Sequence, residues 1–232
     1  MTPLDRPVWS SLTTHHARLS EGNALARRFL RDVNLFAAAV DDSQEGLAAL
    51  AGLVKEGENI FILQVPDIVT PAGLLATKVA KGVQMLATRR MTAVTGGDDV
   101  LTLGDEDAPE MLALARLTEP GPFLPRTHVM GSFIGIRVGG RLVAMAGERM
   151  RFPGYTEVSG VCTHPDFRGR GYARRLSATV ASRIEARGEQ PFLHAWKSNE
   201  AAVSLYEDLG FQLRTDVNVA VLTRQPFACA TG

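Results

Sequence analysis

Residues 161–176, VCTHPDFRGRGYARRL, constrain the fold of this chain more than any other segment. They read as the end of a strand, a turn at Pro165, two glycines set between arginines, and the first turns of a helix. Leu176, Val180 and Ile184 are four residues apart, which places them on one apolar face of that helix. Packed on a sheet, this face holds the helix N-terminus at the carboxyl end of the strand, where open α/β sheets commonly bind ligands.

The predicted helix N-terminus has the features of an anion-binding site. The first turn of a helix carries unpaired N–H groups and a partial positive charge, and glycine lets an anion come close to the backbone. Together they predict a phosphate cradle, surrounded by Arg168, Arg170, Arg174 and Arg175. In the alternative reading, the glycines serve the turn alone and the arginines form a solvated face. Two standard phosphate motifs do not match, because GxxxxGK followed by Ser or Thr is absent and GxGxxG would need glycine at position 174.

The segments around this corner predict a mixed sheet. The expected strands are two in 131–150 with a turn at Gly139-Gly140, then 156–163, 191–196 and two pieces in 211–224, and the expected helices are 170–187 and 198–210. The order of hairpin, strand, helix, strand, helix and strand requires at least one parallel pair, joined by a right-handed crossover helix. The fold class is therefore α/β, with a mixed sheet.

The first 90 residues predict a separate α/β domain without a chemical motif. We expect helices at 20–33 and 43–57, the second capped by Ser43, and strands at 34–40 and 59–65, although 34–40 could also extend the first helix. Residues 66–90 predict irregular structure with a strand near 83–87, and residues 95–99, 100–104 and 105–117 predict a loop, a strand and a helix. The predicted domains are 1–90 and 91–232.

Charge and cysteine content exclude several classes of protein. The net charge is zero, which disfavours general nucleic-acid binding. Residues 1–110 carry 10 basic and 15 acidic side chains and residues 111–232 carry 15 and 10, so an anionic ligand is expected in the second half. The chain has two cysteines, Cys162 and Cys229, and no CxxC, which disfavours a zinc site. One disulfide is an open alternative, but reduced thiols are the plainer expectation. The chain shows neither an apolar signal core nor a run near the ~20 apolar residues of a membrane span, so the expected location is the cytoplasm.

Two motifs resemble the GCN5-related N-acetyltransferase (GNAT) superfamily. RGRGYA at 168–173, after THP and a strand, looks like its R/Q-x-x-G-x-G/A motif, and NEAAVSLYEDLGF at 199–211 looks like its N-x-x-A-x-x-L-Y-x-x-L-G-F motif. The resemblance covers roughly residues 100–224 and is nearest to the FR47-like branch. It implies the acyl-CoA N-acyltransferase fold with an N-terminal α/β extension. The alternation of helices and strands in this extension is compatible with a degenerate half of the same fold.

The resemblance implies that acetyl-CoA binds at this corner, and it implies no metal. The N–H groups of residues 169–174, assisted by Arg168, would hold the pyrophosphate. The strand 161–163 would pair with the pantetheine arm, and the N–H of Val161 would polarise the thioester carbonyl. The implied binding residues are Val161, Cys162, Thr163, Arg168, Gly169, Arg170, Gly171, Tyr172, Ala173, Arg174 and Asn199.

Glu157 and Tyr206 are the catalytic candidates. Glu157 stands eleven residues before Arg168, where some family members carry a general base, and a regular strand would place it on the cleft face with residues 159, 161 and 163. Its alternative is a solvated strand end, and Glu148 and His194 are rival bases. Tyr206 matches the family's general acid, with helix packing as its alternative.

The implied activity is acetyl transfer from acetyl-CoA to a primary amine by direct attack. Cys162 is expected to be a buried strand residue rather than a nucleophile. The alternatives are a non-catalytic acyl-CoA-binding sensor and nucleic-acid binding through the arginines. The expected partners are small-molecule or peptide amines, without nucleic acid or membrane, and a homodimer is compatible with the sequence. The rigid segment EPGPFLP at 119–125 could wall the acceptor pocket.

Overall fold

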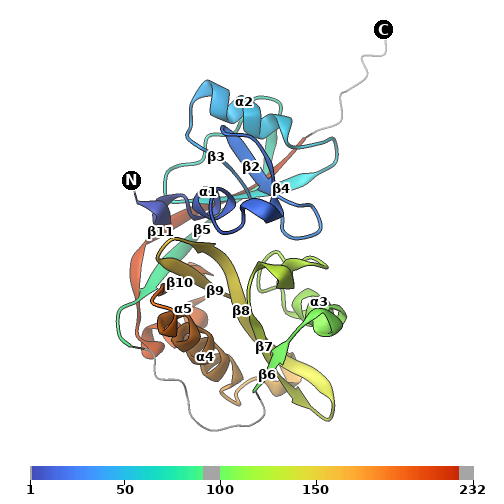
Figure 1. Cartoon of the computed structure of the whole chain (residues 1–232), viewed down its shortest axis with the longest axis vertical. Coiled ribbons are helices and arrows are strands. Elements are labelled where there is room, and N and C mark those ends of the chain that lie inside the picture. Colours follow the sequence, from blue (N-terminus) through green and yellow to red (C-terminus); the bar gives the residue numbers. More distant parts are fainter. Residues whose placement is uncertain (1, 91–99, 225–232) are drawn as a thin grey trace. The chain divides into compact units, whose positions relative to one another are not determined.

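The structure is a computed structural model that describes residues 2–90 and 100–224 (Figure 1). The chain forms two compact units, each made of separate segments. Unit 1 comprises Met1–Leu30, Leu35–Lys81 and Val217–Gly232, and unit 2 comprises Arg31–Asn34 and Gly82–Asp216. Residues 1, 91–99 and 225–232 lie outside the part of the chain that the structure describes. The predicted domain boundary after residue 90 stays a prediction, and the predicted loop at 95–99 lies outside the described residues.

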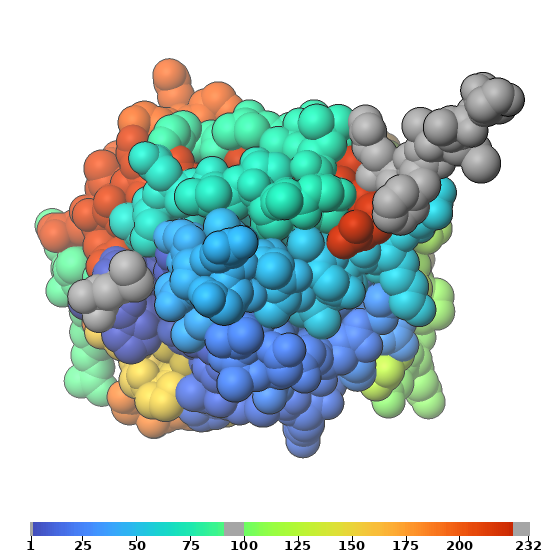
Figure 2. All heavy atoms as spheres, turned by 90° about the horizontal axis from the view of Figure 1, so that it is seen from above, coloured from blue at the N-terminus to red at the C-terminus, as the bar shows by residue number. Residues whose placement is uncertain are grey.

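The described residues of unit 1 form two short α-helices and two groups of strands. The elements are α1 (Pro7–Leu12), β1 (Ser20–Gly22), β2 (Ala26–Phe29), β3 (Ala37–Ala39), α2 (Gln44–Gly52), β4 (Asn59–Gln64), the first part of β5 (Leu75–Ala87) and the last part of β11 (Phe211–Thr223). Strands β1, β2 and β3 form an antiparallel sheet, and β4 pairs antiparallel with β11. In Figure 2, α2 and the segments that precede it form the blue part of the surface of this unit.

The predicted helix at 20–33 is wrong, because this segment folds into β1 and β2. Gly22 has a φ of 126°, and the side chain of Asn23 accepts hydrogen bonds from the N–H groups of Leu25 and Ala26, which closes a turn. Leu25 is 40% exposed whereas Phe29 is fully buried, so the two do not share a helix face. The spacing of apolar residues in this segment therefore does not reflect a helix.

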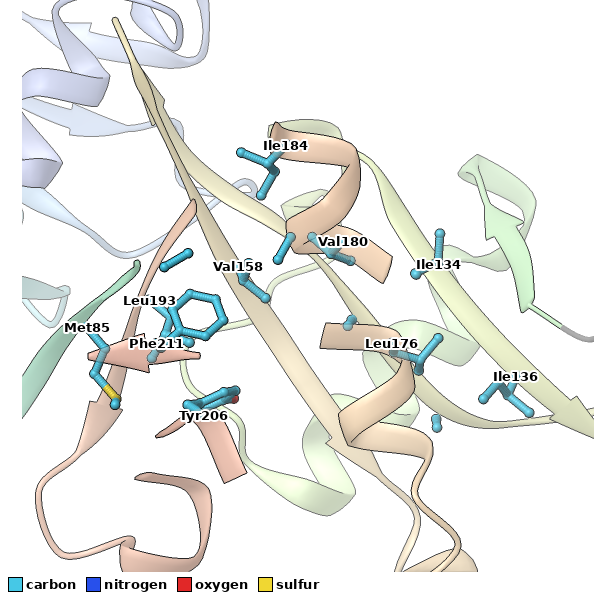
Figure 3. Packing of buried hydrophobic residues seen from close by; sticks show 14 of the residues in the cluster. Met85, Ile134, Ile136, Val158, Leu176, Val180, Ile184, Leu193, Tyr206 and Phe211 are labelled. Atoms are coloured by element: carbon cyan, nitrogen blue, oxygen red, sulfur yellow. The ribbon is translucent and has the colours of Figure 1, made fainter. Parts of the chain in front are cut away.

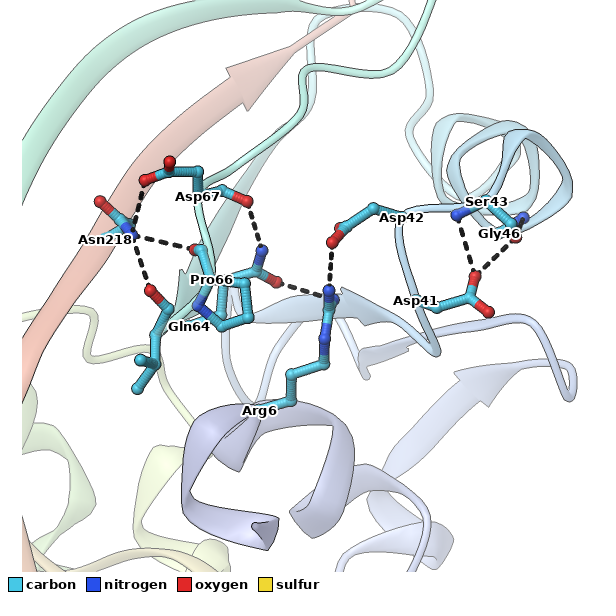
Figure 4. Close-up of polar contacts among 10 residues, drawn as sticks. Arg6, Asp41, Asp42, Ser43, Gly46, Gln64, Pro66, Asp67 and Asn218 are labelled. Carbon is cyan, nitrogen blue, oxygen red and sulfur yellow. Dashed lines mark hydrogen bonds and ion pairs between the residues drawn. The ribbon is translucent and has the colours of Figure 1, made fainter. Parts of the chain in front are cut away.

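Three other elements of unit 1, α2, β3 and β4, follow the prediction. Ser43 caps α2 by accepting a hydrogen bond from the N–H of Gly46 at 3.1 Å (Figure 4). Strand β4 ends at Gln64, just before Pro66, and the segment at 34–40 contains a buried strand, β3. The strand predicted near 83–87 is confirmed as the end of β5, whereas the irregular structure predicted before it is wrong for residues 75–82, because β5 starts at Leu75. Most side chains at 75–81 are exposed, so this part of the strand lacks an alternating apolar pattern.

Unit 2 contains the predicted mixed sheet. Its elements are β6 (Val100–Leu103), α3 (Ala108–Thr118), β7 (Phe133–Val138), β8 (Arg141–Phe152), β9 (Tyr155–Thr163), α4 (Tyr172–Ala186), β10 (Gln190–Trp196) and α5 (Glu200–Leu209). The strand order from β5 is β5-β10-β9-β8-β7-β6, and β10 lies parallel to β9 while the other described pairs are antiparallel. The predicted hairpin turns at Gly139-Gly140, both with positive φ. The two strand pieces predicted in 211–224 form one strand, β11.

The helix α4 packs on this sheet through the predicted stripe. Leu176, Val180 and Ile184 are at most 2% exposed, and they contact the main apolar cluster of unit 2. Figure 3 shows the stripe directed toward the strands that carry Ile134 and Val158. This packing fixes the N-terminus of α4 beside the end of β9, as expected from the sequence.

Candidate active site

The strands β9 and β10 separate where the candidate site begins. Their parallel ladder runs from Gln190↔Tyr155 to Phe192↔Glu157, and β10 then continues against β5. Beyond that point lies a cavity of about 570 Å³. Its walls come from residues 161–163 of β9, residues 194–196 of β10, the loop and first turn of α4, residues 199–206 around α5, and residues 118–120 at the end of α3.

All eleven predicted binding residues line this cavity, from Val161 through Arg174 to Asn199. Gly169 and Gly171 both have a φ of 75°, and a Cβ at either position would meet no atom within 4 Å. The first backbone hydrogen bond of α4 runs from the N–H of Arg175 to the carbonyl of Gly171. The N–H groups of the preceding helix turn therefore have no partner inside the helix, and the glycines leave space for an anion.

The arginines of this corner are partly held by neighbours. The guanidinium of Arg170 lies over the ring of Phe167, 4.9 Å from its centroid, and Arg174 donates to Asp208 at 2.6 Å on α5. Their positive charge stays at the α4 end of the cavity. Thr163 adds a buried hydroxyl oxygen for which the described residues provide no hydrogen-bond partner. A buried hydroxyl without a partner costs free energy, so this wall fits a polar ligand.

Tyr206 lines the cavity and also belongs to the apolar cluster of unit 2. Its ring lies edge-on to Phe211, with 6.0 Å between centroids. Burial, with smaller contributions from the nearby Cys162 and Glu157, raises the pKa of Tyr206 to about 12. The phenol is therefore a neutral hydrogen-bond donor at physiological pH.

The expectation that Glu157 faces the cleft is wrong. Its side chain is fully buried, and it is absent from the described cavity walls. A bulge in β9 explains this, because Gly147 pairs with Ser159 while Met145 pairs with Cys162, and Gly160 has a φ of 63°. The extra residue breaks the alternation of faces between 157 and 163.

Glu157 is instead the centre of a buried ion pair. Arg149 donates two hydrogen bonds to its carboxylate, at 2.8 and 2.7 Å. Burial alone would raise the pKa of Glu157, but the charge of Arg149 and the hydrogen bonds from Arg149 and His194 outweigh burial and lower the pKa to about 2. Such a carboxylate is a weak proton acceptor at neutral pH.

His194 links this ion pair to the cavity. Its Nδ1 lies 2.7 Å from Glu157 Oε1, and its Nε2 lies 3.0 Å from Gln84 Nε2. Arg214 donates to Gln84 Oε1 at 2.9 Å, so the amide NH₂ of Gln84 must face the histidine. Nε2 of His194 is then an acceptor, and the ring proton sits on Nδ1 toward Glu157. Of the two rival bases, His194 lines the cavity, whereas Glu148 is buried against Arg187 at 2.9 Å.

Of the segment 119–125, predicted only as a rigid wall, Glu119 and Pro120 line the cavity, together with Thr118 before it. Thr118 donates to the carbonyl of Leu114 at 2.7 Å and is hydrogen-bonded to Cys162. Burial raises the pKa of the Cys162 thiol to about 11, so the thiol is protonated, as expected for a residue that is not a nucleophile. Glu119 has a φ of 50°, the one positive φ among non-glycine residues in the described chain. The sequence gives no signal for that conformation.

Two kinds of site are missing from the described residues. In 2–90 and 100–224, His, Cys, Asp and Glu side chains do not gather into a group that could hold a metal ion. The helices described there also lack the length and apolar character that a membrane span requires.

Three comparisons place this geometry among known proteins. Residues 133–220 match the family model of the FR47-like protein. The N-alpha-acetyltransferase RimI of Mycobacterium tuberculosis is 39% identical over 91 residues, which cover 38% of this chain and 54% of that protein. The match thus spans about half the length of that curated relative.

Solved structures extend the likeness to the whole chain. A putative acetyltransferase from the GNAT family of Novosphingobium aromaticivorans is 40% identical, covers 97% of this chain and 100% of its own, and superposes with a TM-score of 0.91. A GCN5-related N-acetyltransferase from Kribbella flavida shares the fold at 18% identity, covering 99% of this chain and 98% of its own with a TM-score of 0.63. On its motifs, fold and relatives, this chain belongs to the GCN5-related N-acetyltransferase superfamily, and its residues 133–220 match the FR47-like model.

Proposed function

We propose that this protein is an N-acetyltransferase that transfers the acetyl group of acetyl-CoA to a primary amine. One observation carries the proposal: the cavity joins an anion-accepting helix N-terminus, a free stretch of strand edge and a neutral phenol within one space. The relative from Mycobacterium tuberculosis bears the name N-alpha-acetyltransferase. A peptide N-terminus is therefore the first acceptor to test.

The residues of the cavity fit acetyl-CoA as co-substrate. The N–H groups and arginines of residues 168–174 would hold its phosphates, because glycine clearance and the helix N-terminus favour an anion there. Residues 161–163, which the described ladder leaves unpaired with β10, would hydrogen-bond the amides of the pantetheine arm. The unpartnered hydroxyl of Thr163 lies on this wall. When bound, acetyl-CoA supplies an activated acyl thioester.

Groups of the protein would then stabilise the developing charge and transfer the protons. The N–H of Val161 would stabilise negative charge on the carbonyl oxygen while the amine nitrogen forms its bond to the carbonyl carbon. Tyr206 would donate to the sulfur as the carbon–sulfur bond breaks. His194 would take the proton that the amine loses, at Nε2, and must give up the hydrogen bond from Gln84 to do so. Glu157 would act through His194 as a positioning residue rather than as the base.

Free thiol release from acetyl-CoA tests the proposal. We expect release with alkylamines or with peptides that carry a free N-terminal amine, and calorimetric binding of coenzyme A. Gly171→Glu should abolish both, because a carboxylate would fill and repel the phosphate seat. Gly188→Glu is the matched control, since Gly188 also has a positive φ and open space but lies at the far end of α4. Coenzyme A binding that survives Gly171→Glu would refute the cradle, and absent turnover with every amine would refute the transferase.

A further inference from the structure

Opposite charges divide the walls of the cavity. Arg168, Arg170 and Arg174 lie at its α4 end, and of these Arg174 is paired with Asp208 at 2.6 Å. Among the described residues that line it, Glu119 is the one carboxylate. The other titratable groups on the wall do not carry negative charge at neutral pH, since the pKa values of Cys162 and Tyr206 are raised and the imidazole of His194 is neutral or cationic.

Glu119 lies beside the strand segment 161–163, toward the end of it that is away from the phosphate corner. Its neighbour Thr118 is hydrogen-bonded to Cys162 in the middle of 161–163. Its other neighbour, Pro120, also lines a second small hollow, whose walls include Ser159 and Gly160 at the earlier end of the strand. The chain from 118 to 120 therefore runs along β9 in the direction opposite to the phosphate corner. Arg149, which borders that hollow, is neutralised by its ion pair with Glu157.

The backbone at Glu119 is held in a conformation that glutamate disfavours. With φ 50° and ψ 53°, the residue is left-handed, and it closes α3 by donating its N–H to the carbonyl of Ala115 at 2.8 Å. Glycine is the usual residue at such a helix end. The following Pro120 further restricts the backbone conformations that residue 119 can adopt. Strain of this kind clusters at functional sites. A carboxylate at this position therefore needs a reason other than the turn.

The Glu119 carboxylate is also free to bind a ligand. It is exposed at the cavity wall, and within residues 2–90 and 100–224 it makes no hydrogen bond or ion pair. By contrast, Glu110 of α3 and Asp107 just before it are engaged by Arg137 at 2.8 and 2.7 Å. An open carboxylate on a residue that lines a cavity with otherwise cationic or neutral walls attracts a cation.

We infer that Glu119 anchors the ammonium group of the acceptor before transfer, so that the acceptors of this site are cationic amines. This inference rests on the proposed function. The anionic donor binds at the arginine end and the cationic acceptor at the Glu119 end, and the acceptor nitrogen is thereby held near residues 161–163. Glu119 is a specificity-determining residue, and deprotonation remains with His194.

Steady-state thiol release with a short peptide that has a free N-terminal amine, or with a linear alkylamine, tests this role. Glu119→Gln should raise the KM of the amine about 10- to 100-fold, as expected for a lost hydrogen bond to a charged group, and change kcat less than about twofold. The KM of acetyl-CoA should not change. Glu106→Gln removes an exposed carboxylate in the approach to α3, outside the cavity, and should leave both KM values unchanged.

A second variant separates recognition from folding. Glu119→Gly accommodates the left-handed φ, so it should keep or raise Tm, by up to about 4 °C, while raising the amine KM as Glu119→Gln does. Amine KM values that stay the same in both variants, with turnover intact, would overturn the inference and leave the proposed function standing. Absence of turnover in the unsubstituted protein despite coenzyme A binding would overturn both.

Discussion

The position of one proton on His194 follows from contacts around it. Arg214 orients the amide of Gln84, the amide donates to Nε2, and the Nδ1 proton points to Glu157. The histidine is thus pre-set to accept a second proton on the atom that Gln84 now occupies. The neighbouring carboxylate, kept ionised by Arg149, would stabilise the resulting imidazolium.

Removal of the imidazole should therefore slow transfer without weakening donor binding. We expect His194→Gln to lower kcat by about 10²- to 10⁴-fold, the usual contribution of a general base, with an unchanged coenzyme A Kd. Glu157→Gln should lower kcat less, because the imidazole stays in place. Imidazole nitrogen NMR shifts of His194 should show the Nδ1–H tautomer. A His194→Gln enzyme with full kcat would exclude this base.

Tyr206 should act as a donor across the whole neutral range. Because burial raises its pKa to about 12, the phenol stays protonated until the pH rises toward that value. Tyr206→Phe should lower kcat about 10- to 100-fold while Tm changes by only a few degrees, since the ring still packs on Phe211. A loss of Tm in proportion to activity would instead assign Tyr206 to packing alone.

At the scale of elements, the β7–β8 pair is sensitive to a single added methyl group. Gly147 lies opposite Phe133, and a Cβ at position 147 would collide with the ring of Phe133. Gly147→Ala should destabilise unit 2 by about 1–3 kcal/mol, the usual cost of overpacking. Gly104→Ala, where a Cβ meets open space and φ is negative, is the matched control. Equal melting temperatures for the two variants would contradict this account.

Elements with strong local patterns could be predicted from the sequence, and elements without them could not. The stripe on α4, the cap at Ser43 and the Gly-Gly hairpin each depend on residues near in the chain. The first half of β5 has exposed residues on both faces and leaves no pattern to read. Similarly, the bulge that turns Glu157 from the cleft toward Arg149 depends on how β8 and β9 align, which periodicity alone does not reveal.

For unit 2 as a whole, the buried carboxylate of Glu157 makes the free energy of unfolding depend on pH at acidic pH. The pKa of Glu157 is lowered in the folded state, so its stabilising contribution is complete above its ordinary pKa near 4.5 and is lost as the pH falls toward about 2. Glu157→Gln should remove this slope, and it should also destabilise the protein at pH 7 by about 3–5 kcal/mol, because Arg149 then stays buried without its partner. Urea unfolding followed between pH 2 and 7 checks both effects.

The pairing of β4 with the last part of β11 can form only late in protein synthesis. Thr223 donates its hydroxyl proton to the carbonyl of Glu58, a contact between residues 165 positions apart. At about 5–20 residues per second, a ribosome finishes β4 roughly 10 to 30 s before it supplies this partner. For that time the edge of β4 that β11 later covers has no strand beside it. The first unit to emerge from the ribosome is therefore the last to be completed, and nascent chains are most open to mispairing in that interval.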